Sequence, residues 1–132
     1  MRALLDTHIW LWMLTEPDRL GTTRGLVEDP DTELLLSAAS TWEIGIKYAL
    51  GRLPLPGPPA SYVPDRLRSS AVTTLPIGVS DTLAVAELPH HHRDPFDRLL
   101  VVQAQAHGIP IITADDQIAQ YDVEVLHPDA DR

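Results

Sequence analysis

Short apolar runs alternate along the chain with longer stretches that carry helical spacing and capping residues. The apolar runs are too short for helices and predict buried strands at residues 2–5, 33–37, 71–77, 109–115 and 123–126. The stretches between them predict helices at residues 7–17, 23–28, 40–51, 61–70, 80–88 and 94–108. This alternation predicts an α/β fold, with a central parallel sheet of four to five strands, right-handed crossovers and helices on both faces.

The clearest of these helices runs from Asp94 to Gly108. Asp94 is a suitable N-cap, Pro95 fits the first helical position, and Asp97 falls at the third, where free backbone N–H groups favour a carboxylate. Gly108 supplies the left-handed residue that commonly ends a helix. Taken alone, the two aspartates are therefore explained as caps, each contributing about 1 kcal/mol.

The first helix is apolar on nearly every side. Trp10, Met13 and Leu14 share one face, and Leu11 and Trp12 cover much of the rest. A helix of this kind is buried or meets a partner. A core position is favoured for each tryptophan, but the crowding also indicates a surface for an oligomer or another partner.

Length and composition predict one globular domain over residues 1–132. Hydrophobic residues make up 44% of the chain and charged residues 22%, and the absence of cysteine excludes a disulfide framework, a thiolate zinc site and a cysteine nucleophile. The run IWLWML is far shorter than the roughly 20 residues of a membrane span, so we expect a cytoplasmic protein without a membrane anchor. The net charge of −9 disfavours binding of nucleic acid through a positive surface and favours a basic partner or a cation-loaded acidic site.

Four carboxylates are predicted to meet at one edge of the sheet. Asp6 and Asp115 end strands, and Glu43 and Asp97 lie in the first turns of helices that begin at the same edge. Ligands of α/β folds gather at this edge. Each acid also has a structural alternative: Asp6 or Thr7 as cap of the first helix, Ser40 with Glu43 as a capping box, Asp97 as a cap partner, and Asp115 as cap of a short helix at DDQIAQ.

Four negative charges in one cleft need compensation, because two carboxylates about 4 Å apart repel by roughly 4 kcal/mol at an effective dielectric constant of about 20. Arg93, Arg98 or Lys47 could supply the positive charge, but a hard divalent cation is the favoured interpretation. Oxygen ligands with an open, hydrated face suit Mg²⁺ or Mn²⁺. These ions activate water and stabilise in-line displacement at a phosphodiester.

The histidines are not expected to bind this ion. Zinc is poorly supported, because adjacent side chains such as His90, His91 and His92 rarely point at a single ion. We interpret the triplet as an exposed loop, with phosphate as a candidate contact. His8 is interpreted as a packed or hydrogen-bonded residue rather than as a catalytic base.

Four segments together carry a family resemblance. In order and spacing, the segments LLDTHIWLW, SAASTWEIGIKYALG, HHRDPFDRLLVVQA and IPIITAD resemble PIN-domain ribonucleases of the VapC toxin type, and the match covers nearly the whole chain. The resemblance implies a PIN-like three-layer fold. It also implies an acidic set that binds metal and carries catalysis, with Asp94 as an auxiliary carboxylate: Asp6, Glu43, Asp97 and Asp115.

The resemblance further implies a magnesium-dependent endoribonuclease, with Mn²⁺ as a substitute ion, that cleaves RNA to slow translation and growth. It implies homodimers and a co-expressed VapB-type antitoxin, whose basic side chain enters the acidic cleft and holds the enzyme inactive. Asp116 leaves the fourth acid ambiguous, and Asp115 is preferred because it directly follows the strand. Thr7 and Ser40 are candidates to orient the acids by hydrogen bonds, although simple capping explains them equally well.

Two other classes of function compete with this interpretation. A non-catalytic module could use the acidic cleft only to dock a basic peptide, and metal-dependent turnover would distinguish the enzyme from it. A phosphoryl-accepting signalling module also places aspartates at strand ends, but it needs a lysine after a late strand. The only lysine here, Lys47, lies in an early helix, so this alternative ranks low.

Overall fold

The computed structural model describes residues 1–129, which form a five-stranded sheet with the order β3-β2-β1-β4-β5. The strands are β1 (Arg2–Leu5), β2 (Glu33–Ser37), β3 (Thr73–Leu75), β4 (Ile111–Ile112) and β5 (Val125–Leu126). Every neighbouring pair is parallel, and Leu5 of the central strand pairs with Leu36 on one side and Ile112 on the other. The predicted parallel α/β fold is confirmed, with β3, β4 and β5 shorter than expected.

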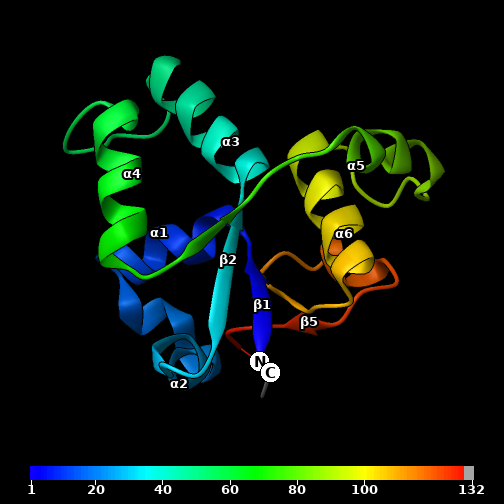
Figure 1. Ribbon diagram of the computed structural model, residues 1–132, viewed down its shortest axis with the longest axis horizontal. Coiled ribbons are helices and arrows are strands. Elements are labelled where there is room, and N and C mark those ends of the chain that lie inside the picture. The colour runs from blue at the N-terminus through cyan, green and yellow to red at the C-terminus, as the bar shows by residue number, and fades with distance from the viewer. Residues whose placement is uncertain (130–132) are drawn as a thin grey trace.

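The helices cover both faces of this sheet. They are α1 (Thr7–Thr15), α2 (Arg24–Glu28), α3 (Ala38–Ala49), α4 (Pro59–Ser69), α5 (Val79–Ala84) and α6 (Pro95–His107), with short 3-10 turns at Pro17–Thr23, Val85–Glu87 and Ile118–Gln120. Figure 1 shows α1, α2 and α4 on one side of the sheet and α5 and α6 on the other. In the part of the chain that is described, no helix has the length and apolar character needed to cross a membrane.

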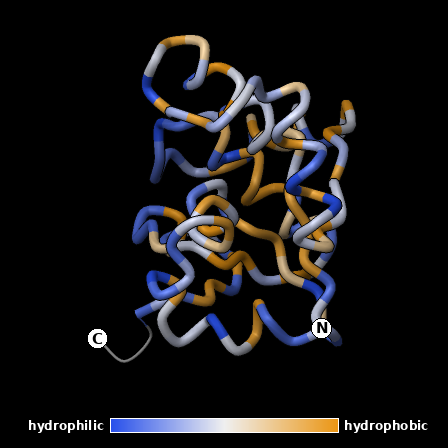
Figure 2. Tube along the Cα trace, turned by 90° about the vertical axis from the view of Figure 1, so that its left-hand side faces the viewer, coloured by the Kyte–Doolittle hydropathy of each residue, from blue (hydrophilic) through white to orange (hydrophobic). Residues whose placement is uncertain are grey.

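Two hydrophobic cores result from the alternation of side chains along the strands. Leu4 and Ile111 point toward α6, whereas Leu5 and Ile112 point toward the layer that contains Trp10 of α1. The hydrophobic stretches accordingly run through the middle of the trace in Figure 2. Trp10 is fully buried, as expected for a core position, but the same expectation is wrong for Trp12, which is partly buried, and for Trp42, which is 59% exposed. The large exposed apolar side chains lie mainly on α3 and α5.

Capping residues set where the helices at the functional edge begin. Asp6 caps α1 by accepting a hydrogen bond from the backbone N–H of Thr7, and Asp94 caps α6 by accepting from Phe96 and Asp97. Gly108 ends α6 with a φ of +62°, in the left-handed region that glycine adopts at no steric cost. These are the caps that the sequence indicated.

Other helix ends differ from the prediction. Ser37, not Ser40, caps α3, because its Oγ accepts from the backbone N–H of Ala39; the predicted capping box of Ser40 and Glu43 is therefore wrong. The fifth helix begins after Gly78 rather than at Ser80. The segment DDQIAQ forms only a 3-10 turn at Ile118–Gln120, and the 3-10 turn at Pro17–Thr23 was not anticipated.

Candidate functional site

One acidic cleft lies where β1 and β4 end. In the sheet, β2 lies on one side of β1 and β4 lies on the other, so the strand order reverses direction at β1. Such a switch point is where α/β folds bind ligands. The cleft has a volume of about 340 Å³ and brings together all four predicted acids. Its lining residues are Asp6, His8, Trp12, Glu43, Lys47, His92, Asp94, Asp97, Ala114 and Asp115.

Asp6 is fixed at the floor of this cleft by both of its carboxylate oxygens. Oδ1 accepts from the backbone N–H of Thr7 at 2.7 Å, and Oδ2 accepts from Oγ1 of Thr113 at 2.7 Å. Its own backbone N–H continues the sheet by donating to Ile112. Burial raises the pKa of Asp6, although the hydrogen bonds from Thr113 and Thr7 act in the opposite direction.

Glu43 reaches the cleft from the second turn of α3. Its Oε1 accepts from Oγ1 of Thr7 at 2.7 Å, and its Oε2 accepts from Nζ of Lys47 at 2.6 Å. The hydrogen bond to Glu43 raises the pKa of Lys47, so this lysine stays charged. Lys47 is thus the one predicted cation that compensates an acid of the cleft directly.

The other two candidate cations do not contact the acids. Arg98 is buried, and its guanidinium donates to backbone carbonyls, with the shortest contact to Val85 at 2.9 Å. Arg93 is exposed. Neither arginine therefore pairs with a carboxylate among the contacts of residues 1–129.

Asp97 carries a strong electrostatic perturbation. Burial, followed by the negative charges of Asp6, Asp94, Glu43 and Asp115, raises the pKa of Asp97 to about 9. The protein thus gathers more carboxylates than its own cations neutralise. Such an arrangement is typical of functional sites.

Asp115, rather than Asp116, faces this cluster. Oδ1 of Asp115 accepts from the backbone N–H of Gln117 at 2.8 Å, and its backbone N–H donates to Oγ1 of Thr113 at 3.0 Å. The side chain of Asp116 is 65% exposed, lies 3.9 Å from Nε2 of His127 and does not line the cleft. The structure therefore places the preferred residue of the pair in the site.

The auxiliary residues divide into two groups. Thr7 holds Glu43 as expected, and Asp94 lines the cleft while capping α6. Ser40 is fully buried, but its Oγ has no hydrogen-bond partner among the described residues, so the structure gives it no contact that would orient an acid. His8 lines the cleft and is exposed, contrary to the expected packed position.

His92 is the site residue that the sequence prediction missed. His90 and His91 are exposed, as expected for the triplet, but the side chain of His92 is only 13% exposed. Its Nε2 lies 2.8 Å from Oδ2 of Asp115 and 3.0 Å from Oδ2 of Asp97. The only sequence signal for it is its position two residues before the Asp94 cap, and His90 and His91 lie almost as close to that cap.

The donor set fits a divalent cation. One potential ligand atom from each of His92, Asp97 and Asp115 lies within 4.8 Å of the others, and further oxygen donors from Asp6 and Glu43 line the same cleft. Carboxylate oxygens are the ligands that hard divalent ions prefer. The raised pKa of Asp97 also indicates a cation site, because a bound cation would offset the negative charge that burial disfavours.

Comparison with known proteins decides the family. The family model described as PIN domain matches residues 3–124. The chain belongs to the PIN domain family. The acidic cleft described above therefore lies at the switch point of a PIN fold, at the edge where the sequence predicted it.

Two curated relatives of this PIN domain come from Mycobacterium tuberculosis. It is 49% identical to Ribonuclease VapC16 over 65 residues, a match that covers 49% of this chain and less than half, 46%, of that protein. It is 29% identical to Ribonuclease VapC22 over 120 residues, covering 90% of this chain and 91% of that protein. Similarity to the second relative thus extends over nearly the whole PIN domain.

The fold is also that of a solved complex. VapBC2 from Rickettsia felis, bound to a DNA fragment from its promoter, contains a chain that superposes with a TM-score of 0.70. The superposition covers 96% of this PIN domain and 98% of that chain, at 15% identity. At this level of identity the likeness concerns the fold.

Proposed function

We propose that this chain is a divalent-metal-dependent endoribonuclease toxin that cleaves RNA in the cytoplasm, inhibits translation and growth, and is neutralised by a VapB-type antitoxin. The observation that carries the proposal is the convergence of Asp6, Glu43, Asp97 and Asp115 in one cleft of a PIN fold. The names of the two M. tuberculosis relatives, both ribonucleases, support it.

Three aspartates would hold the ion, and Mg²⁺ is the proposed physiological one, with Mn²⁺ as a substitute. Asp6, Asp97 and Asp115 offer carboxylate oxygens, and Glu43 would act partly through water. A bound ion of this kind supplies an activated water and stabilises charge at the scissile phosphodiester.

The protein side chains keep this set in place. Asp6 is held by Thr7 and Thr113, and Glu43 is held between Thr7 and Lys47. Because each acid is oriented by hydrogen bonds within the fold, the cleft is organised before an ion or an RNA binds.

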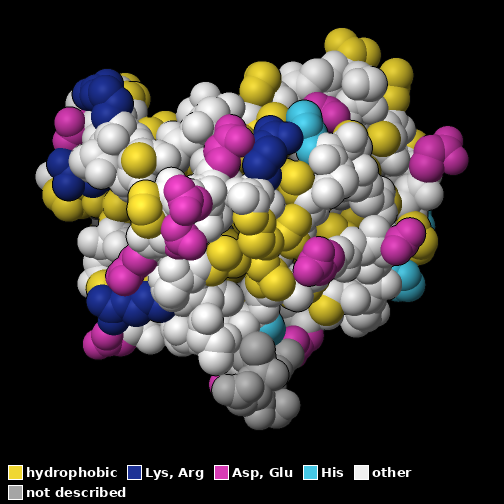
Figure 3. All heavy atoms as spheres, turned by 60° about the horizontal axis from the view of Figure 1, so that its bottom comes forward, with side chains coloured by type: hydrophobic (Ala, Val, Ile, Leu, Met, Phe, Trp, Pro, Cys, Tyr) yellow, Lys and Arg dark blue, Asp and Glu magenta, His cyan; other side chains and the backbone are white. Residues whose placement is uncertain are grey.

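Broad electrostatic attraction is not the basis of RNA recognition in this proposal. Many surface arginines are already paired with acids, including Arg2 with Glu33 and Arg24 with Asp18. On the face seen in Figure 3, the basic side chains lie beside acidic ones, and the right-hand part shows acidic side chains without basic neighbours. RNA would therefore be positioned mainly through the ion and the residues around the cleft, such as Lys47 and His8.

An antitoxin would bind the carboxylates of the same cleft. A basic side chain entering the cleft would compete with the cation for the carboxylates, and the net charge of −9 favours such a partner. A solved complex with the same fold is a VapBC assembly, which supports this part of the proposal.

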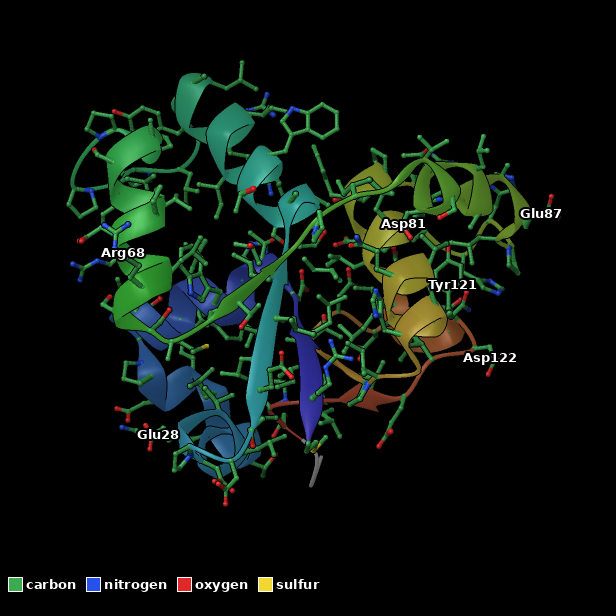
Figure 4. The ribbon with its side chains drawn as sticks, in the orientation of Figure 1. Glu28, Arg68, Asp81, Glu87, Tyr121 and Asp122 are labelled. Carbon is green, nitrogen blue, oxygen red and sulfur yellow. The ribbon has the colours of Figure 1, made fainter. Side chains whose placement is uncertain are left out.

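The decisive experiment is cleavage of a labelled total-RNA pool by purified protein with Mg²⁺, Mn²⁺ or EDTA. The Asp97→Asn variant should lose the metal-dependent cleavage. Asp122→Asn is the matched control, because Asp122 is exposed and lies outside the cleft (Figure 4). Metal binding without cleavage, in protein verified as folded and free of antitoxin, would favour the alternative of a module that docks a basic peptide.

A homodimer is a second part of the proposal. Four large apolar side chains are between 59% and 78% exposed, which is unusual for residues of this type. They are Trp42 on α3, Leu50 at the end of α3, and Val79 and Leu83 on α5. Light scattering after size exclusion should give about twice the mass of 14.6 kDa. A monomer at micromolar concentration would refute this part without affecting the nuclease assignment.

A further inference from the structure

His92 joins two acids of the cleft that come from different parts of the fold. Asp97 lies in the first turn of α6, and Asp115 lies in the loop after β4. One ring nitrogen, Nε2, is within hydrogen-bonding distance of Oδ2 of both residues, at 3.0 and 2.8 Å. The imidazole therefore lies between two acidic side chains from different elements.

The backbone around His92 is held by hydrogen bonds on both sides of its peptide unit. Its N–H donates to Oη of Tyr121 at 2.9 Å, and its carbonyl accepts from Nη1 of Arg98 at 3.4 Å. The Arg98 guanidinium also donates to the carbonyls of Val85, Leu88 and Pro89, so it fastens the whole loop to α6. Tyr121 lies beside α6 in Figure 4. The position of the ring is thus built into the fold.

A second contact assigns the tautomer of the ring. The backbone N–H of Asp94 donates to Nδ1 of His92 at 3.2 Å, so Nδ1 offers its lone pair there. In a neutral imidazole the hydrogen then resides on Nε2. A protonated Nε2 donates to carboxylates and has no lone pair for a metal ion. The assignment follows from the hydrogen-bond network.

We propose that His92 is a positioning residue of the metal site, which shares its single Nε2–H between Asp97 and Asp115 and does not itself ligate the ion. This inference rests on the proposed function in taking the acidic cleft as the metal site. The hydrogen bonds engage Oδ2 of each aspartate and leave Oδ1 of Asp97 and the second lone pairs of both Oδ2 atoms for the cation.

Mn²⁺ serves as the probe, because electron paramagnetic resonance measures both its affinity and its ligands. His92→Leu removes the donor at similar volume and should weaken Mn²⁺ binding about 10- to 100-fold, the usual effect of losing a residue that orients metal ligands. His92→Gln places an amide N–H near the position of Nε2 and should restore affinity to within about threefold. His91→Leu, in the exposed neighbour, is the control and should bind Mn²⁺ as the wild type does.

Pulsed measurements on wild-type protein labelled with ¹⁵N-histidine test the same inference without any variant. A positioning role predicts only the weak coupling of a remote nitrogen, whereas a directly bound nitrogen would overturn the inference. Unchanged Mn²⁺ affinity in folded His92→Leu protein would overturn it as well. If that variant does not fold, the wild-type spectrum decides.

These readouts separate the inference from the proposed function because they involve no RNA. Mn²⁺ binding that depends on His92, in a protein that cleaves no RNA, would leave the positioning role intact and refute the nuclease. Metal-dependent cleavage, together with an Mn²⁺ affinity that His92→Leu leaves unchanged, would support the nuclease and refute the positioning role. A wild-type protein that binds no Mn²⁺ would refute the positioning role, since there would be no ion to serve.

Discussion

Oγ1 of Thr7 donates a 2.7 Å hydrogen bond to Oε1 of Glu43, a residue 36 positions away in the chain. The same threonine donates its backbone N–H to Asp6, so one residue orients acids from two elements, the end of β1 and the second turn of α3. Glu43 has no role in capping its own helix. Its conformation depends on this long-range contact and on Lys47.

Replacing Thr7 by valine should therefore impair the site while leaving the fold intact. Thr7→Val keeps the backbone N–H that Asp6 accepts but removes the hydroxyl donor to Glu43, and we expect RNA cleavage to fall about 10-fold. Thr7→Ser retains the donor and should stay within about threefold of wild type. Equal activity of the valine and serine variants in a cleavage assay would show that Glu43 does not need this hydrogen bond.

The neighbouring aspartates after β4 should behave differently. Asp115 lines the cleft and contacts His92, whereas the mostly exposed Asp116 lies beside His127. We expect Asp115→Asn to reduce metal-dependent cleavage roughly 100-fold, which corresponds to about 3 kcal/mol of lost stabilisation of the transition state. Asp116→Asn should change the rate by less than about threefold. A larger loss in the second variant would reassign the fourth acid.

Arg98 should contribute mainly to stability. Its buried guanidinium donates to several loop carbonyls, and Arg98→Met would leave these acceptors without partners inside the protein. We expect a loss of about 3 kcal/mol in the free energy of unfolding, measured by urea denaturation. Arg93→Met, in the exposed neighbour of the same segment, should change it by less than about 0.5 kcal/mol. Similar values for the two variants would contradict the anchoring role.

Local signals in the sequence predicted much of the fold and of the cleft. Asp6 and Asp94 act as caps in the positions expected, and the parallel sheet brings Asp6 and Asp115 to one edge because both follow neighbouring strands. Such features depend on residues close in sequence and on the general geometry of parallel sheets.

The remaining features depend on contacts between distant residues. Ser37 and Ser40 are both acceptable caps by residue type, and the choice of Ser37 follows from where β2 ends. His92 reaches the cleft because Tyr121, 29 residues later, and Arg98 fix its loop. No spacing rule distinguishes it from His90 and His91, which are exposed. The sequence therefore predicted that the four acids meet in one cleft but not that a histidine lies among them.

Replacing Asp97 should raise the stability of the protein while removing an acid of the proposed metal site. Its pKa is about 9 in the folded protein, against about 3.9 in an unfolded chain, so the folded state binds the extra proton between these values. Stability therefore falls as pH rises through this window, because at pH 8 the folded protein must keep a proton that the unfolded chain has released. Without metal, Asp97→Asn should melt at a higher temperature than wild type, by about 4 °C for each kcal/mol relieved.

The metal and the pH provide the controls for this prediction. The stability advantage of Asp97→Asn should shrink as the pH is lowered toward 5, because less free energy is then needed to protonate the carboxyl that the unfolded wild-type chain ionises. Excess Mg²⁺ should raise the melting temperature of the wild type more than that of the variant, since a ligand stabilises only the state that binds it. A variant that melts below the wild type at pH 8 in EDTA would mean that burial does not strain this carboxylate, and the electrostatic argument for a cation at the site would fail.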